Sequence, residues 1–245
     1  MMQLWSPDAV DFMRDASEFG DYYERLADVL MTWLPPDGHI CDAGCGLGYL
    51  SQSLAGRCRQ VTAIDCSKAA VSALQTRPHA ENLICRCADL LSDDIAVRYD
   101  AMVFCYFGRF PEIMYIARKQ CKGKVIIVKR DCSEHRFSLG TVPRHTDIMQ
   151  VTQALLAQHA IPYERETISL ELGQPFRSIE DAIRFFGLYN CGNAEISPEA
   201  VRERLIPIDC GAYRWYLPER RKMGILVINA VDIPDLFANR ELIKG

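Results

Sequence analysis

Residues 40–51, ICDAGCGLGYLS, constrain this chain more than any other stretch, because three glycines alternate directly after an apolar run that ends in an acid. Glycine adopts left-handed backbone conformations that side chains disfavour, and it lets the backbone approach a ligand closely. A helix that follows such a loop adds exposed N–H groups and the positive end of its dipole. The stretch therefore predicts a ligand site after the first strand of an α/β sheet.

The glycine spacing differs from that of two phosphate-binding loops. A P-loop reads GxxxxGK[ST], and no lysine follows here; the dinucleotide loop reads GxGxxG, whereas this chain has GxGxG. Asp42 stands two residues before the first glycine, where its carboxylate would repel a pyrophosphate. The same carboxylate suits a cationic ligand, such as one that carries an ammonium group.

Apolar and helical stretches alternate from residue 39 to residue 128. The expected strands are 39–43, 60–64, 83–87, 100–105 and 124–128, and the expected helices between them are 48–56, 67–77, about 92–97 and 111–121. Strands separated by helices are typical of a parallel sheet that is covered on both faces.

The alternation of apolar strands and helices ends after residue 130. We expect an irregular segment, a helix at 146–159, an alternating strand at 163–172, helices that start at Ser178 and Ser197, and a last apolar strand at 223–231. At the N-terminus, Ser6-Pro7 is typical of a helix start, and Pro35-Pro36 ends the helical region. The plan is five β/α units, a strand, a helical insertion and a final strand.

Three acidic residues lie at the carboxyl ends of three successive expected strands. Asp42 opens DAGCGLG, Asp65 ends the second strand in VTAIDCS, and Asp89 follows the third strand in CADLL, at spacings of 23 and 24 residues. With the fourth strand, YDAMVFCYF, this succession resembles the class I S-adenosylmethionine-dependent methyltransferases over roughly residues 20–130.

The resemblance implies an α/β, Rossmann-like, doubly wound sheet of seven strands, mostly parallel with an antiparallel last strand, plus a helical lid insertion. We expect a single domain over residues 1–245. Its parts are a helical cap at 1–36, a cofactor-binding core at 37–130, and substrate or lid segments at 131–162 and 173–222.

The resemblance also implies a site for S-adenosylmethionine, with S-adenosylhomocysteine as the product. Asp65 would bind both ribose hydroxyls, Asp89 the adenine amine, and Cys105 would lie beside the methionine part. Tyr22 would lie over the cofactor. The full set of expected cofactor residues is Tyr22, Asp42, Ala43, Gly44, Gly46, Asp65, Cys66, Ala88, Asp89, Leu90 and Cys105.

Each of these assignments has a structural alternative. Asp65 followed by Ser67 also fits a helix cap, and Asp89 also fits a turn. Tyr22 and Tyr23 also fit ordinary core positions.

The acceptor side is less defined by sequence. Methyltransferases of base and amide groups carry an Asn/Asp-Pro-Pro-Tyr/Phe signature after the fourth strand, whereas this chain has CYFGRF at 105–110. That difference favours a small-molecule acceptor. The substrate-side candidates are His135, His145, Tyr106 and Tyr213. Arg130, Arg136 and Arg144 fit either an anionic substrate or a solvated loop, and the aromatic residues of 173–222 fit either a pocket wall or lid packing.

Composition limits the partners. The net charge of -4 and the pI of about 5.8 argue against a nucleic-acid surface. No apolar run reaches the ~18 residues of a membrane span, and acids stand where a signal peptide has basic residues. Eleven cysteines without a CxxC pair predict neither a metal site nor a disulfide framework. We expect a cytoplasmic monomer or homodimer that acts on a small molecule, without a membrane partner.

Three other functions stay open at this point. One is a noncatalytic protein that binds S-adenosylmethionine or a nucleoside. Another is aminopropyl transfer from the decarboxylated donor, although the acids that hold a polyamine are missing from CYFGRF. The last is methylation of RNA or protein.

Overall fold

The structure is a computed structural model, and it describes residues 5–91, 97–131, 137, 139, 148–190 and 194–239. The chain forms two compact units. The sheet unit comprises Tyr23–Asp131, Asp147–Ile168 and Met223–Gly245, and the insert unit comprises Met1–Tyr22, Cys132–Thr146 and Ser169–Lys222. The division into cap, core and lid that we expect from the sequence stays a prediction.

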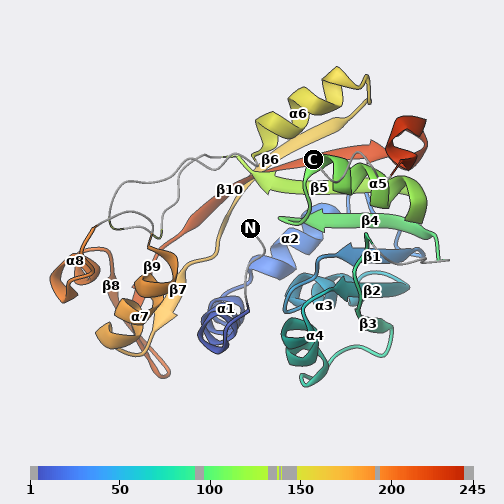
Figure 1. The fold of residues 1–245 in the computed structure, drawn as a ribbon. Helices are drawn as coiled ribbons and strands as arrows, with labels where there is room; N and C mark the ends of the chain where they lie inside the picture. The colour runs from blue at the N-terminus through green and yellow to red at the C-terminus, as the bar shows by residue number, and fades with distance from the viewer. Residues whose placement is uncertain are drawn as a thin grey trace. The chain divides into compact units, whose positions relative to one another are not determined.

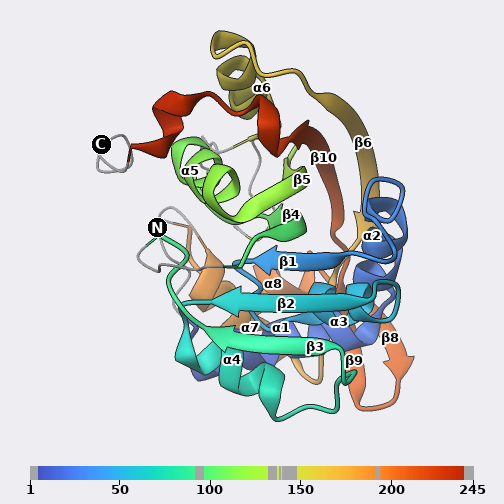
Figure 2. The same cartoon turned by 90° about the vertical axis from the view of Figure 1, so that its right-hand side faces the viewer.

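The sheet unit is built on a seven-stranded sheet in the order β3-β2-β1-β4-β5-β10-β6 (Figures 1 and 2). Its strands are β1 (His39–Ala43), β2 (Gln60–Asp65), β3 (Leu83–Cys87), β4 (Tyr99–Cys105), β5 (Cys121–Arg130), β6 (Glu164–Glu171) and β10 (Arg220–Asn229). The first five strands pair in parallel, whereas β10 runs antiparallel to β5. The fold predicted from the sequence is therefore confirmed.

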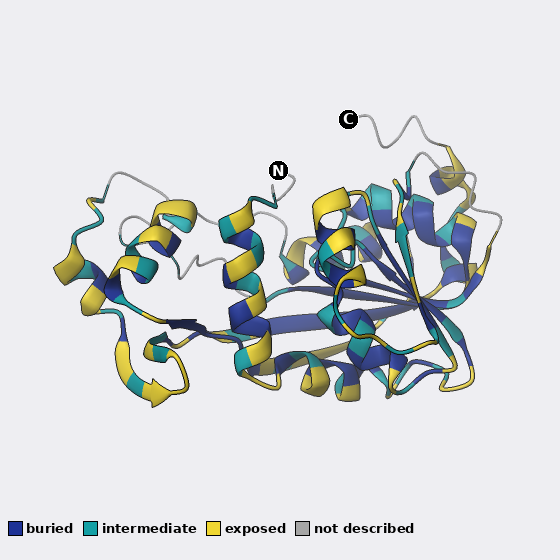
Figure 3. Cartoon of the chain, turned by 90° about the horizontal axis from the view of Figure 1, so that it is seen from below, coloured by how far each residue is buried: buried dark blue, intermediate teal, exposed yellow. Residues whose placement is uncertain are grey.

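Helices of the sheet unit follow its strands along the chain. They are α2 (Tyr22–Leu30), α3 (Tyr49–Ala55), α4 (Lys68–Gln75), α5 (Phe110–Gln120), α6 (Met149–Gln158), η1 (Ala230–Asp232) and η2 (Asp235–Ala238). Figure 3 shows the central strands of the sheet, β1, β2, β4, β5 and β10, as largely buried, with exposed residues on the outer sides of the helices. The expected helix at 92–97 falls almost wholly on residues 92–96, which lie outside the described ranges.

The insert unit combines helices with a small sheet. It contains α1 (Pro7–Phe19), β7 (Gln174–Phe176), α7 (Ile179–Tyr189), α8 (Pro198–Arg202), β8 (Ile206–Cys210) and β9 (Tyr213–Leu217). The three strands form an antiparallel sheet in the order β7-β9-β8. Its core contains Phe12, Phe176, Phe185 and Phe186. The sequence predicts the helices of this segment but not the small sheet.

Three helix starts form as their sequences predict. The side-chain oxygens of Ser6, Ser178 and Ser197 each accept the N–H group three residues later, at 3.2 Å. Among the described residues, no helix has the length and apolar character that crossing a membrane requires.

Candidate functional site

The glycine loop follows β1 at the carboxyl edge of the sheet. Gly44, Gly46 and Gly48 have φ angles of 71°, 53° and 73°, in the left-handed region. A Cβ on Gly44 would lie 2.1 Å from the ring of Phe107, and one on Gly48 would lie 2.5 Å from Leu74. Both conformation and space therefore require glycine at positions 44 and 48.

Hydrogen bonds tie this loop to the end of β2. The N–H groups of Gly44 and Cys45 donate to the carbonyl of Ile64 at 2.8 and 3.0 Å. The N–H of Gly46 donates to Oδ2 of Asp65 at 2.9 Å. The loop conformation thus depends on the carboxylate that the sequence assigns to the ribose.

Asp65 also holds the start of α4, since its Oδ1 accepts from the N–H of Ser67 at 2.8 Å. The side chain of Ser67 caps α4 by accepting from Ala70 N–H at 3.3 Å. The N-cap of α4 is therefore Ser67, and Asp65 supports the turn that leads into it. Each carboxylate oxygen can accept a second bond, so these bonds leave acceptor capacity for a ligand diol.

Asp42 lies beneath the glycine loop and is only 2% exposed. Its Oδ2 accepts from the hydroxyl of Ser51 in α3 at 2.5 Å. Burial raises the pKa of Asp42 to about 6, and the charge of Asp65 adds to this, while the Ser51 bond opposes it. The ionised form is therefore destabilised by the fold and would be favoured by a nearby cation.

The end of β3 carries the third acid. Ala88 N–H donates to the carbonyl of Asp65 at 3.0 Å, and Asp89 Oδ1 accepts from Leu91 N–H at 2.9 Å. Asp89 is exposed, whereas Leu90 is buried and its carbonyl accepts from Gln120 Nε2 at 3.2 Å. Because β1, β2 and β3 are neighbours (Figure 2), Asp42, Asp65 and Asp89 stand at or just after the carboxyl ends of adjacent strands.

The turn after β4 packs directly on the glycine loop through the Gly44–Phe107 contact. Tyr106 has φ 55°, which is rare for a residue with a side chain, and its N–H donates to the carbonyl of Val128 at 3.0 Å. Lys129 is buried and donates from Nζ to the carbonyl of Gly108 at 2.6 Å. Cys105 is half-buried at the end of β4.

Side chains outside the glycine loop also contact it. Arg77 donates to the carbonyl of Leu47 at 2.5 Å, and its guanidinium lies 3.7 Å from the ring centre of Tyr49. Tyr49 in turn stacks on Tyr23, with centroids 5.7 Å apart. Tyr23 thus has a packing contact within the sheet unit, while a contact with the cofactor stays a prediction.

Two of the remaining predicted residues belong to the insert unit. Tyr22 is 1% exposed, and the guanidinium of Arg221 lies 6.0 Å from its ring centre. Tyr213 packs edge-on against Phe19, with centroids 5.6 Å apart, and its hydroxyl lies 3.5 Å from Nη2 of Arg177. His135 and His145 lie outside the described residues.

Several residues of the site were not predicted from the sequence. Ser51, Phe107 and Lys129 contact the loops only through the tertiary fold. The one sequence signal was a lysine inside the otherwise apolar end of KVIIVK, which is unusual for a buried strand.

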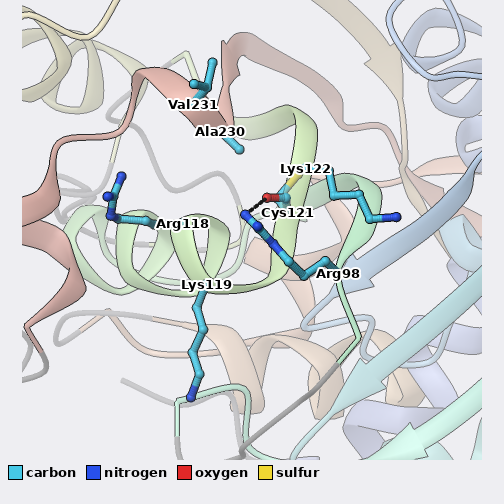
Figure 4. A pocket seen from close by; sticks show the side chains of 7 residues that line it. All are labelled: Arg98, Arg118, Lys119, Cys121, Lys122, Ala230 and Val231. Atoms are coloured by element: carbon cyan, nitrogen blue, oxygen red, sulfur yellow. Dashed lines mark hydrogen bonds between the residues drawn. The ribbon is translucent and has the colours of Figure 1, made fainter.

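A separate cavity of about 630 Å³ lies at the amino ends of β4 and β5, the edge opposite the glycine loop (Figure 4). Its lining residues are Arg98, Arg118, Lys119, Cys121, Lys122, Ala230 and Val231. Three of its cations already have protein partners. Arg98 bonds the carbonyl of Cys121, Arg118 pairs with Asp235, and Lys122 lies 3.4 Å from Asp100. We therefore do not assign the ligand site to this cavity.

No cluster of three or more His, Cys, Asp or Glu side chains within the described ranges could hold a metal ion.

Comparison of the sequence with known protein families is consistent with the glycine loop and the strand order described above. Residues 40–121 match the family model for a methyltransferase domain. No curated protein matches the chain in sequence.

Among solved structures, a candidate methyltransferase from Bacillus halodurans has a TM-score of 0.52 and 11% identity, covering 86% of this chain and 99% of its own. The YcgJ protein from Bacillus subtilis has a TM-score of 0.50 and 12% identity, covering 84% and 98%. The [4+2]-cyclase SpnF has a TM-score of 0.51 and 15% identity, covering 91% and 93%. At such identities these structures support the fold.

The strand order and the match of residues 40–121 to a methyltransferase domain agree, and both support a methyltransferase-type fold for the sheet unit.

Proposed function

We propose that this protein transfers a methyl group from S-adenosylmethionine to a small-molecule acceptor. One observation carries the proposal: three left-handed glycines directly follow the buried Asp42, and the middle one, Gly46, donates its N–H to Asp65. A loop of this shape brings backbone N–H groups close to a ligand, and its acids suit a ligand with a positive charge.

The residues of the sheet unit fit this donor. Asp65 offers oxygens to a vicinal diol, and Asp89 offers an exposed carboxylate to an exocyclic amine. Asp42 offers its charge beneath the loop, where Ser51 orients it. Cys105 ends β4, the strand beside β1, and Tyr106 follows it, so we propose that both flank the transferred group.

S-adenosylmethionine supplies a methyl group that its sulfonium already makes electrophilic. The chain must hold the acceptor in line with the bond between the sulfur and the methyl carbon, ~3 Å from that carbon, and must exclude water. Such positioning can lower the activation barrier by about 7–11 kcal/mol. A general base is needed only where the acceptor is protonated at the working pH. Tyr106, Tyr213, His135 and His145 remain the substrate-side candidates.

A small-molecule acceptor is supported by sequence features rather than by an observed pocket. The chain is acidic, with a net charge of -4, and CYFGRF replaces the signature of base-modifying enzymes after β4. We also expect a cytoplasmic monomer or homodimer, which light scattering of the purified protein would test.

A noncatalytic or differently catalytic protein is the main competing function. The similarity to SpnF, a cyclase, shows that this fold also serves another reaction. Donor binding and methyl transfer therefore need separate assays.

Calorimetric titration with S-adenosylmethionine, S-adenosylhomocysteine, NAD and ATP tests the donor. We expect micromolar affinity for the first two ligands and none for the others. A preference for NAD would overturn the proposal. Formation of S-adenosylhomocysteine in the presence of a metabolite extract then tests turnover, and tight donor binding without any turnover would favour the noncatalytic function.

A further inference from the structure

Two exposed thiols stand at neighbouring strand ends beside Asp65. Cys66 directly follows β2, and Cys87 is the last residue of β3. We propose that Cys66 and Cys87 form an oxidisable dithiol, which a hydroperoxide converts to a disulfide that weakens donor binding. The effect on the donor rests on the proposed function, whereas the disulfide itself does not.

The strand register brings the two cysteines within bonding range. Asp65 and Cys87 are paired in the parallel ladder of β2 and β3, and Cys66 is one residue farther along. With strands ~4.8 Å apart and a rise of ~3.3 Å per residue, the two Cα atoms lie about 6 Å apart. Disulfides join Cα atoms separated by about 4.4–6.8 Å. The backbone therefore already has the separation that the bond requires.

The side chain of Cys87 is turned toward its neighbour. Its Sγ lies 3.7 Å from the carbonyl oxygen of Cys66, so the thiol faces the gap between the strand ends. The backbone on both sides is held: Ala88 N–H donates to Asp65 O at 3.0 Å, and Ser67 N–H donates to Asp65 Oδ1 at 2.8 Å. Because Cys87 pairs with Asp65, regular strand geometry would turn Cys66 to the opposite face of the sheet. Cys66 lies outside β2, so forming the bond requires the backbone at Cys66 to turn toward β3.

The reaction is a two-electron oxidation with a complete balance. One thiolate attacks a peroxide oxygen and becomes a sulfenic acid, while the departing hydroxide takes a proton to give water. The second thiolate then attacks the sulfenic sulfur and displaces another hydroxide, which becomes a second water. Two thiols and one hydrogen peroxide give one disulfide and two waters.

The neighbouring charges set the pH dependence of this step. Partial burial raises the pKa of the Cys66 thiol, and the carboxylates of Asp65 and Asp89 raise it further. Because the thiolate is the reactive form, oxidation is expected to accelerate as the pH rises.

The disulfide would act on the donor through its neighbours. Cys66 lies between Asp65 and Ser67, whose N–H bonds the Asp65 carboxylate. A disulfide between Cys66 and Cys87 of β3 is expected to shift residues 65–67 and to narrow the space beside the Asp65 carboxylate, where the donor ribose is proposed to bind. We expect the affinity for S-adenosylhomocysteine to fall at least tenfold on oxidation.

The test uses the full-length protein, reduced or treated with hydrogen peroxide at pH 8. Peptide mass analysis without reductant reports the Cys66–Cys87 link, and calorimetry reports S-adenosylhomocysteine affinity before oxidation, after it, and after re-reduction. Cys87→Ser should keep the affinity of the reduced protein and lose its sensitivity to peroxide. Cys210→Ser, at the exposed cysteine of β8, is the matched control and should stay sensitive.

A linked peptide with a reversible loss of affinity supports the proposal. Oxidation of the two thiols to separate sulfinic acids, without a linked peptide, overturns the dithiol. A linked peptide with unchanged affinity overturns the effect on the donor. If the reduced protein does not bind S-adenosylhomocysteine at all, the proposed function fails together with that effect, while the mass analysis still decides the dithiol.

Discussion

Asp65 combines two tasks in one side chain. Its two oxygens fix the glycine loop through Gly46 N–H and the start of α4 through Ser67 N–H. The proposed ribose contact uses the acceptor capacity that these bonds leave. Because the same carboxylate fixes the loop and is proposed to bind the donor, a substitution of Asp65 is expected to change both the loop conformation and the donor affinity.

We predict that Asp65→Ala weakens S-adenosylhomocysteine binding by about 2–4 kcal/mol, or ~30- to 1000-fold, because charge-assisted bonds are lost and two donors are left unpaired. Calorimetry measures the loss, and circular dichroism checks the fold. Asp28→Ala is the matched control, since Asp28 pairs with Arg57 in the same unit, and its affinity should be unchanged. Normal binding by a folded Asp65→Ala protein would leave Asp65 as a cap alone.

Asp42 lowers the stability of the fold at neutral pH. Its pKa rises from the ordinary aspartate value of 3.8 to about 6 in the folded chain, so the folded state binds more protons than the unfolded state between these values. Stability therefore falls as the pH rises from about 4 to 6, and the ionised carboxylate costs about 3 kcal/mol above that range.

We therefore predict that Asp42→Asn increases the free energy of unfolding at pH 8 by up to about 3 kcal/mol and flattens its change between pH 4 and 6. The amide oxygen can still accept from Ser51, so the local packing is kept. Urea unfolding at a series of pH values measures both effects, with Asp28→Asn as the control. A destabilised Asp42→Asn protein at pH 8 would contradict the prediction.

The glycine loop tolerates substitution poorly. Gly44→Ala places a methyl group 2.1 Å from the Phe107 ring at a φ of 71°. We predict a loss of about 2–5 kcal/mol, combining ~1–2 for the left-handed backbone with ~1–3 for overpacking. Thermal or urea unfolding measures it.

Two comparisons separate these contributions. Gly20→Ala should be nearly neutral, because nothing lies within 4 Å of its added Cβ and its φ is -135°. Gly44→Ala combined with Phe107→Ala should recover the overpacking part, giving a coupling of ~1–3 kcal/mol. Additive losses in the double variant would show that the ring does not limit position 44.

The elements that can be predicted from the sequence are those whose pattern lies within a short run of consecutive residues. The strands from β1 to β5 were predicted because each is an apolar run between helices, and the glycine loop because its left-handed positions admit little else. The serines at 6, 178 and 197 predicted helix starts because capping is a contact within one turn.

What the sequence did not predict depends on contacts between distant segments. Strands β7 and β8 are three and five residues long and contain Pro175 and Pro207, so neither shows a strand pattern. The Gly44–Phe107 contact joins residues 63 positions apart, and the Lys129–Gly108 bond joins different elements. No local rule relates such pairs.

In the whole molecule, the three acids proposed for the donor, Asp42, Asp65 and Asp89, belong to the sheet unit, whereas Tyr213 and the expected cofactor residue Tyr22 belong to the insert unit. Tyr213 is held within the insert unit by Phe19 and Arg177. We predict that Tyr213→Phe changes S-adenosylhomocysteine affinity by less than about threefold and stability by about 1–2 kcal/mol, because the hydroxyl contacts with Arg177 and Asp15 are lost while the ring stays in place. Calorimetry and urea unfolding measure these. Loss of donor binding in a folded Tyr213→Phe protein would show that the donor site needs this residue.

The burial of Asp42 has a consequence for the protein's response to its surroundings. Under the proposed function, a proton and the cationic donor would compete for the Asp42 carboxylate, so protonation is expected to weaken donor binding. With a pKa of about 6, the apparent dissociation constant is expected to be about tenfold larger at pH 5 than at pH 8. A chain with this loop would therefore lose its donor as its surroundings acidify, well before the fold itself gives way.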